Sequence, residues 1–101
     1  MSDADRIVLV TGASRGIGAA IARAFAADGA IVVGTATSEA GAVGISERLA
    51  KSGGRGEVVD VASGESVTTL FARLAELELV PSIVVNNAGI TRDNLLARMK
   101  E

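Results

Sequence analysis

The chain of 101 residues contains no cysteine, no histidine, no tyrosine and no tryptophan. Without cysteine and histidine there is no thiol nucleophile, no disulfide and no zinc site of the usual kind. Tyrosine, histidine and cysteine are also side chains that enzymes use to donate a proton to a reacting group. Several classes of enzyme are therefore excluded before any motif is considered.

Aromatic side chains and long apolar runs are also scarce. Hydrophobic residues make up 49% of the chain, but only Phe25 and Phe71 are aromatic, so we expect one modest core of small, branched side chains. No apolar run is long enough to span a membrane, and the first residues are acidic, unlike a signal peptide. The net charge of -2 argues against a nucleic-acid surface. We expect a cytoplasmic protein whose partner is a small molecule. We expect it to bind neither a membrane nor nucleic acid.

Strand-like and helix-like segments alternate along the chain. Short runs rich in β-branched residues predict strands at 6–10, 30–33, 56–61 and 83–85. Apolar residues at helical spacing predict helices from residue 17 to Asp28-Gly29, over about 39–51, after Ser63, and beginning again over 93–101. Ser38 is a candidate N-cap for the second helix.

This alternation predicts an α/β fold, a Rossmann-type parallel sheet with strand order 3-2-1-4 that is truncated after the fourth strand. Right-handed crossovers place the first two helices on one face of the sheet and the third helix on the other. The fourth strand keeps an open edge, and the two faces are unevenly covered. We therefore expect a homo-oligomer built from one partial domain over residues 1–101.

The segment Thr11-Gly12-Ala13-Ser14-Arg15-Gly16-Ile17-Gly18 has glycines spaced GxxxGxG between a predicted strand and a predicted helix. In this context Gly12 allows a sharp turn, Gly16 lets a pyrophosphate approach the backbone, and Gly18 lets the helix pack closely. The free N–H groups at the start of the helix then face the phosphates. The alternative is a glycine-rich turn without a ligand.

The end of the second predicted strand indicates which dinucleotide is bound. A fold of this type that binds NAD usually has an acid about 20 residues beyond the first glycine. Residues 34–38 contain no carboxylate, whereas the hydroxyls of Thr37 and Ser38 are suited to a phosphate and Arg15 to the charge of a 2′-phosphate. Unless Arg15 is only a solvated loop residue, this pattern predicts NADP as the cofactor.

Polar residues also lie at the carboxyl ends of the third and fourth predicted strands, at the sheet edge where open α/β folds bind ligands. Asp60 is a candidate for contact with the adenine edge, and its alternative role is a turn or helix cap. Asn86-Asn87-Ala88-Gly89 follows the fourth strand. Two amides and a glycine there suit a ribose and a closely approaching backbone, although a structural asparagine turn has the same composition.

Together, TGxxxGxG after the first strand and NNAG after the fourth resemble the short-chain dehydrogenase/reductase family. Residues 34–39 and 86–96 are most similar to its bacterial 3-oxoacyl-[acyl-carrier-protein] reductases, over essentially the whole chain but only the front part of such a reductase. The resemblance implies NADP as cofactor, and an acyl carrier protein-linked 3-oxoacyl thioester as the substrate reduced in fatty acid synthesis. It implies an NADP site formed by Gly12, Ser14, Arg15, Gly16, Ile17, Thr37, Asp60, Val61, Asn86 and Gly89.

The same resemblance implies that catalysis requires a Tyr-x-x-x-Lys pair and a serine, which in this family come from segments beyond residue 101. The chain has no tyrosine, and its lysines are Lys51 and Lys100, so no catalytic residue is assigned. Three hypotheses follow: a truncated ketoreductase that binds nucleotide without turnover, a non-enzymatic half-domain that binds nucleotide or assembles, and part of a reductase of another carbonyl substrate.

Overall fold

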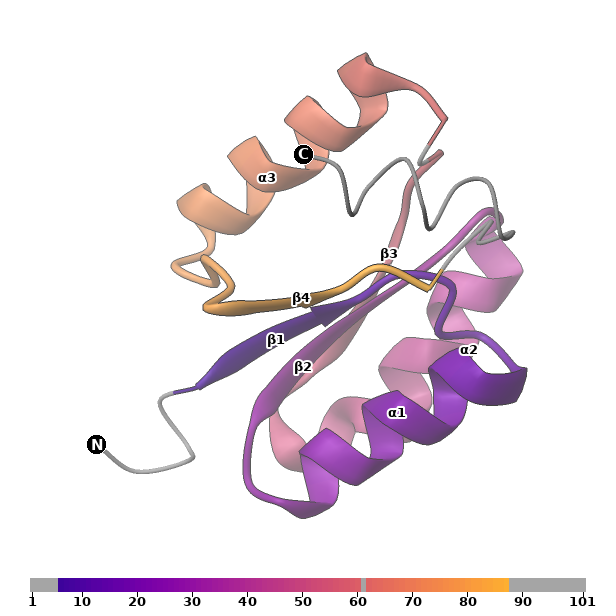
Figure 1. The fold of residues 1–101 in the computed structure, drawn as a ribbon, viewed down its shortest axis with the longest axis vertical. Helices are drawn as coiled ribbons and strands as arrows, with labels where there is room; N and C mark the ends of the chain where they lie inside the picture. The colour runs from indigo at the N-terminus through magenta and orange to yellow at the C-terminus, as the bar shows by residue number, and fades with distance from the viewer. Residues whose placement is uncertain (1–5, 61, 88–101) are drawn as a thin grey trace.

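The computed structural model describes residues 6–60 and 62–87, in which strands and helices alternate (Figure 1). The strands are β1 (Ile7–Val10), β2 (Ile31–Ala36), β3 (Arg55–Val58) and β4 (Ile83–Val85). The helices are α1 (Gly16–Ala27), α2 (Glu39–Leu49), the short 3₁₀ helix η2 (Ala50–Ser52) and α3 (Gly64–Glu76). The fourth helix predicted over 93–101 lies outside the described residues.

The strands form one parallel sheet in the order β3-β2-β1-β4, which confirms the predicted topology. β1 pairs with β2 on one side and with β4 on the other, and Val10 stands opposite Val85 in the second pairing. Because the strands are parallel, their carboxyl ends meet at one edge of the sheet. The segments that follow β1, β2 and β4 therefore come together there.

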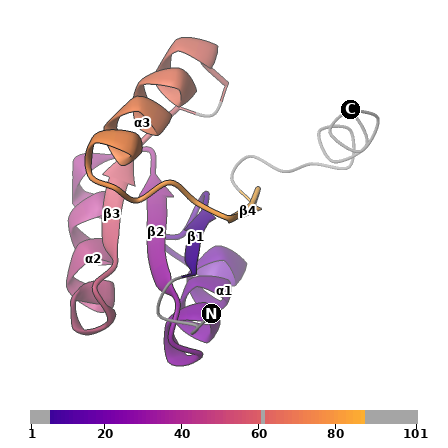
Figure 2. The same cartoon turned by 90° about the vertical axis from the view of Figure 1, so that its left-hand side faces the viewer.

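Helices cover both faces of this sheet. Figures 1 and 2 show α1 and α2 together on one face and α3 on the other, as the handedness of the crossovers predicts. Successive β1 residues alternate between the two cores: Val8 and Val10 pack in the cluster beneath α1 and α2, and Leu9 packs with Leu70 and Leu74 of α3. β1 is apolar on both sides because each of its sides is buried.

β2 is longer than the sequence predicted, and β3 is shorter. β2 continues through Thr35 to Ala36 because these residues pair with Glu57 and Val58 of β3. Thr35 lies beyond the predicted end of this strand at residue 33, but it is 1% exposed in the structure. Its hydroxyl is buried with a partner, since it accepts a hydrogen bond from the Gly12 N–H at 3.3 Å.

The predicted ends of the helices are largely confirmed. Ser38 caps α2 by accepting a hydrogen bond from the Gly41 N–H at 3.1 Å. The α-helical part of α2 ends at Leu49, two residues earlier than predicted, because the chain tightens into η2 before Gly53 adopts a left-handed φ of 81°. In the part of the chain that the structure describes, no helix has the length and apolar character needed to cross a membrane.

Candidate functional site

The glycine-rich loop between β1 and α1 adopts the conformations that its glycines predicted. Gly12 and Gly16 have φ angles of 66° and 64°, a left-handed region that glycine enters without a steric penalty. A Cβ placed on Gly18 would lie 2.0 Å from the Gly12 carbonyl oxygen and 2.6 Å from Asn87 Nδ2. Glycine at this position therefore allows the first turn of α1 to pack directly against the loop.

The start of α1 differs from the starts of the other two α-helices. α2 and α3 are capped by Ser38 and Ser63 and carry an acidic residue in the first turn. α1 begins after Arg15, has no acidic residue in its first turn, and receives no side-chain cap from the described residues. Its first N–H groups and the positive end of its dipole are thus left for an external acceptor, and an anion is the favoured one.

Hydrogen bonds from β2 and β4 hold the loop in place. The Asn87 N–H donates to Thr11 Oγ1 at 2.8 Å, and Asn87 Nδ2 donates to the Gly12 carbonyl at 3.2 Å. Thr11 Oγ1 donates in turn to Asn86 Oδ1 at 3.3 Å. Thr35 Oγ1 of β2 also holds the loop, because it accepts a hydrogen bond from the Gly12 N–H. The loop joins β1 to α1, but residues of β2 and residues that follow β4 also hold it in position.

A cavity of about 370 Å³ lies in front of α1. Its lining comes from the glycine loop and from the ends of β2, β3 and β4: Gly12, Ser14, Arg15, Gly16, Thr35, Ala36, Thr37, Val59 and Asn87. Five of the predicted site residues thus meet in one place, namely Gly12, Ser14, Arg15, Gly16 and Thr37. A Cβ on Gly16 would meet nothing within 4 Å, so the space beside the helix start is open.

Of the remaining predicted residues, the three that the structure describes do not line this cavity. Ile17 is 73% exposed, and Asn86 is engaged with Thr11. Asp60 forms a turn, in which its Oδ1 accepts from the Ala62 N–H at 3.0 Å, as its alternative role predicted. Val61 and Gly89 lie outside the described residues.

Three lining residues are not among the candidates from the sequence: Thr35, Ala36 and Val59. Asn87 is one of the two amides that the NNAG motif offered for a ribose, but sequence order alone does not show which of two adjacent asparagines faces the loop. Thr35 and Ala36 lie beyond the second predicted strand, which ended at residue 33. The strand pairing that places these residues beside the loop is long-range, so no local signal marks them.

The charge of the cavity fits a phosphate-containing ligand. Arg15 is the cation among the described lining residues, and none of those residues is acidic. Hydroxyl groups from Ser14 and Thr37 add neutral donors, and the uncapped start of α1 adds backbone donors. This set of groups favours an anion over a cation. Within the described residues, no group of three or more acidic side chains could hold a metal ion.

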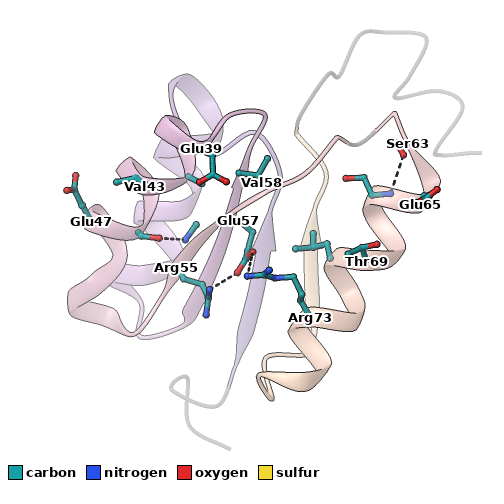
Figure 3. A pocket seen from close by; sticks show the side chains of 15 residues that line it. Glu39, Val43, Glu47, Arg55, Glu57, Val58, Ser63, Glu65, Thr69 and Arg73 are labelled. Carbon is teal, nitrogen blue, oxygen red and sulfur yellow. Dashed lines mark hydrogen bonds and ion pairs between the residues drawn. The ribbon is translucent and has the colours of Figure 1, made fainter.

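A larger cavity of about 730 Å³ lies between α2 and α3 beside β3 (Figure 3). At its floor the Glu57 side chain, only 7% exposed, pairs with Arg55 Nε at 2.7 Å and with Arg73 Nη2 at 3.2 Å. Glu39, Glu47 and Glu65 lie around it. The four glutamates that line this groove outnumber its two arginines, so it does not favour an anion, and none of its described lining residues belongs to the glycine loop. This groove is therefore not the candidate site.

A family model described as short chain dehydrogenase matches residues 6–101. The chain is 54% identical over 103 residues to the 3-oxoacyl-[acyl-carrier-protein] reductase FabG of Pseudomonas aeruginosa, with 100% of this chain and 42% of the relative covered. It is 55% identical over 97 residues to the protein of the same name from Escherichia coli, covering 95% of the chain and 39% of the relative. The chain thus spans about two-fifths of the length of these curated relatives.

Proposed function

Because the chain belongs to the short-chain dehydrogenase family, we propose that residues 1–101 form the NADP(H)-binding part of a 3-oxoacyl-[acyl-carrier-protein] reductase. The observation that carries the proposal is the uncapped start of α1, which opens with its glycine loop onto the 370 Å³ cavity. The names of the relatives support the substrate class, a 3-oxoacyl thioester on acyl carrier protein.

Each part of the cavity suits one part of the dinucleotide. The N–H groups of the first turn of α1, beside Gly16, would hold the diphosphate. Arg15 and Thr37 would take the 2′-phosphate, and Asn86 and Asn87 stand at the end of β4, where a ribose would approach. When bound, NADPH supplies the hydride for carbonyl reduction. The residues of this chain bind and orient the cofactor, and none of them is assigned to proton transfer.

The end of β2 supports NADP over NAD. A carboxylate at this position would accept a hydrogen bond from the free ribose 2′-hydroxyl of NAD and repel a 2′-phosphate. Here Ala36 and Thr37 line the cavity instead, together with the cationic Arg15. Ser38 also follows β2, but its hydroxyl already accepts from the Gly41 N–H. Thr37 is thus the better placed of the two hydroxyls considered from the sequence.

Titration of the chain with NADPH and with NADH tests the proposal. We expect Arg15→Ala to weaken NADPH binding by about tenfold to a hundredfold, the range for losing a charge-assisted contact. NADH binding is expected to change little, because NADH has no 2′-phosphate. Isothermal titration calorimetry measures both affinities directly.

Arg23→Ala is the matched control for this experiment. Arg23 also lies on α1 and is exposed, but it does not line the cavity. The control removes the same charge and should leave both affinities unchanged. Failure of the unaltered chain to bind either nucleotide would refute the proposed function, and equal losses for both nucleotides in Arg15→Ala would refute the assignment of the 2′-phosphate to Arg15.

A non-enzymatic half-domain that binds NADP and assembles with itself is the second candidate. One observation favours it: the side chain of Val84 in β4 is 51% exposed, which leaves apolar surface for assembly. A reductase of a different carbonyl substrate differs from the main proposal in the carbonyl compound that it reduces, and not in its cofactor. Nucleotide binding is common to all three hypotheses, and turnover separates them.

A further inference from the structure

A side chain from α2 contacts the back of the glycine loop. Arg48 Nη2 donates a hydrogen bond to the Ser14 carbonyl oxygen at 2.9 Å, across 34 residues of sequence. Arg48 is exposed and is not one of the residues that line the 370 Å³ cavity. It therefore contacts the loop from outside the space proposed for the nucleotide.

The Arg48 side chain runs along α2 past Gly44. Helical side chains point toward the N-terminus of their helix, which directs Arg48 over this glycine. A Cβ on Gly44 would lie 3.9 Å from Arg48 Nη1 and 4.0 Å from Nη2, which is ordinary van der Waals contact. A methyl group at position 44 would therefore be tolerated, and only a longer side chain would displace the guanidinium. Three residues earlier, a Cβ on Gly41 would lie 2.7 Å from Ala36 Cβ and 3.4 Å from Ser14 Cβ, so glycine there lets α2 pack closely against the end of β2 and the loop.

The contact determines the direction of the next amide. The Ser14–Arg15 peptide is planar and trans, so its C=O and its N–H point in opposite directions. Holding the Ser14 oxygen toward α2 directs the Arg15 N–H away from α2. Arg15 is also the N-cap of α1, where its backbone is extended with a φ of -162°. One hydrogen bond thus orients both the last loop amide and the residue whose side chain lines the cavity.

We propose that Arg48 is a positioning residue for the nucleotide, one that acts through the Ser14–Arg15 peptide without touching the ligand. This inference rests on the proposed function for its ligand. Arg48 and Arg15 should therefore differ in which nucleotide affinities they affect. The loop amides would face the diphosphate, which NADPH and NADH share, so loss of Arg48 weakens both nucleotides equally, whereas loss of Arg15 weakens NADPH alone.

The test uses Arg48→Met, which keeps a long stem and removes the guanidinium. We expect the affinities for NADPH and NADH to fall together by about threefold to tenfold, in line with the loss of one exposed hydrogen bond from a charged donor. In the nucleotide-free chain, backbone ¹⁵N order parameters of Ser14, Arg15 and Gly16 should also decrease. Arg23→Met, which removes a guanidinium that makes no contact with the loop, should change neither measurement.

A second variant separates the contact from the charge. Gly44→Leu keeps Arg48 but occupies the path of its side chain, so it should reproduce the effects of Arg48→Met. Unchanged order parameters in both variants, or a loss confined to NADPH, would overturn the proposal. If the unaltered chain bound neither nucleotide, the proposed function and the nucleotide part of this inference would both fail, while decreased order parameters would still establish that Arg48 orders the loop.

Discussion

At Gly18 the glycine loop and the first turn of α1 approach each other so closely that a Cβ has no room. Alanine there would place a carbon 2.0 Å from the Gly12 carbonyl oxygen, a backbone atom that cannot rotate away. We expect Gly18→Ala to lower the free energy of unfolding by about 1–3 kcal/mol, the usual cost of overpacking. Urea denaturation measures this loss, and nucleotide binding should fall with it because the loop must shift.

Gly64→Ala is the control for that prediction. Gly64 also lies in the first turn of a helix, α3, but a Cβ there would meet nothing within 4 Å. This change should leave stability unchanged or raise it slightly, since alanine is the better helix former. Similar losses of stability in both variants would mean that helix position, and not the contact with Gly12, determines the cost.

Single residues of the site were predictable where the reason is local. Gly12 was identified because a sharp turn after a strand requires a left-handed residue, and the structure confirms its φ of 66°. Arg15 and Thr37 line the cavity as expected. The roles of Asp60 and Asn87 were harder to predict, because a carboxylate or an amide at the end of a strand suits a turn as well as a ligand. The structure places Asp60 in the turn and Asn87 beside the loop.

The strand β3 forms one edge of the sheet, and helices on both faces close that edge. The Val59 N–H bonds to the Ala36 carbonyl at 3.0 Å, so the alternate residues Gly56 and Val58 direct their backbone groups outward. The Gly56 N–H donates to Ser46 Oγ of α2 at 2.8 Å, and beyond the strand the Asp60 N–H donates to Ser66 Oγ of α3 at 2.9 Å. Covering outward donors in this way protects an edge against pairing with another chain.

We expect the double change Ser46→Ala and Ser66→Ala to expose this edge. Each substitution should cost roughly 0.5–1.5 kcal/mol of stability through the lost hydrogen bond. The pair should also increase self-association, since two outward N–H groups become available to a second strand. Urea denaturation and sedimentation velocity measure the two effects.

Ser52→Ala is the control for the edge. It removes the hydrogen bond from Ser52 Oγ to the Leu49 carbonyl, 3.0 Å long, within η2 and away from the outward face of β3. The control should lose some stability without gaining association. If it associated as strongly as the double variant, general destabilisation would account for the association, and the serines would not protect the edge.

At the scale of the whole molecule, apolar side chains of β4 and α3 are exposed among the described residues. Val84 is 51% exposed, and Phe71 on the neighbouring α3 is 39% exposed. Because parallel sheets are usually covered on both faces, we expect the chain to self-associate through this surface. Sedimentation equilibrium should show an average mass that rises with concentration. Val84→Thr, which keeps a β-branched side chain, should weaken the association, and a monomer at all concentrations would contradict the idea.

The whole chain should bind NADPH without using it. General acid catalysis typically contributes about a hundredfold to ten-thousandfold, and the chain contains no tyrosine, histidine or cysteine to provide it. We therefore expect no NADPH oxidation with a short 3-oxoacyl thioester, measured by absorbance, under conditions where a full-length family reductase is active. Turnover within about a hundredfold of that control would place a catalytic group within these residues.

The sequence by itself determined the fold and the glycine loop of the candidate site. The alternation of strands and helices, the cap at Ser38 and the turn at Gly12 follow from local patterns. The order β3-β2-β1-β4 is typical of a Rossmann-type sheet, and the handedness of crossovers then places the helices on its faces. These features depend on residues a few positions apart, or on rules that hold for every parallel sheet. They could therefore be predicted from the sequence with no coordinates.

Only the tertiary structure decided how the loop is held. Arg48 contacts Ser14 across 34 residues, and Asn87 contacts Gly12 across 75. Each contact requires that strand register, helix rotation and side-chain direction agree to within the length of a hydrogen bond. A change of one residue in the register of β4 would turn Asn87 to the other face. These long-range contacts cannot be predicted from local sequence, because their geometry is set only when the strands and helices pack together.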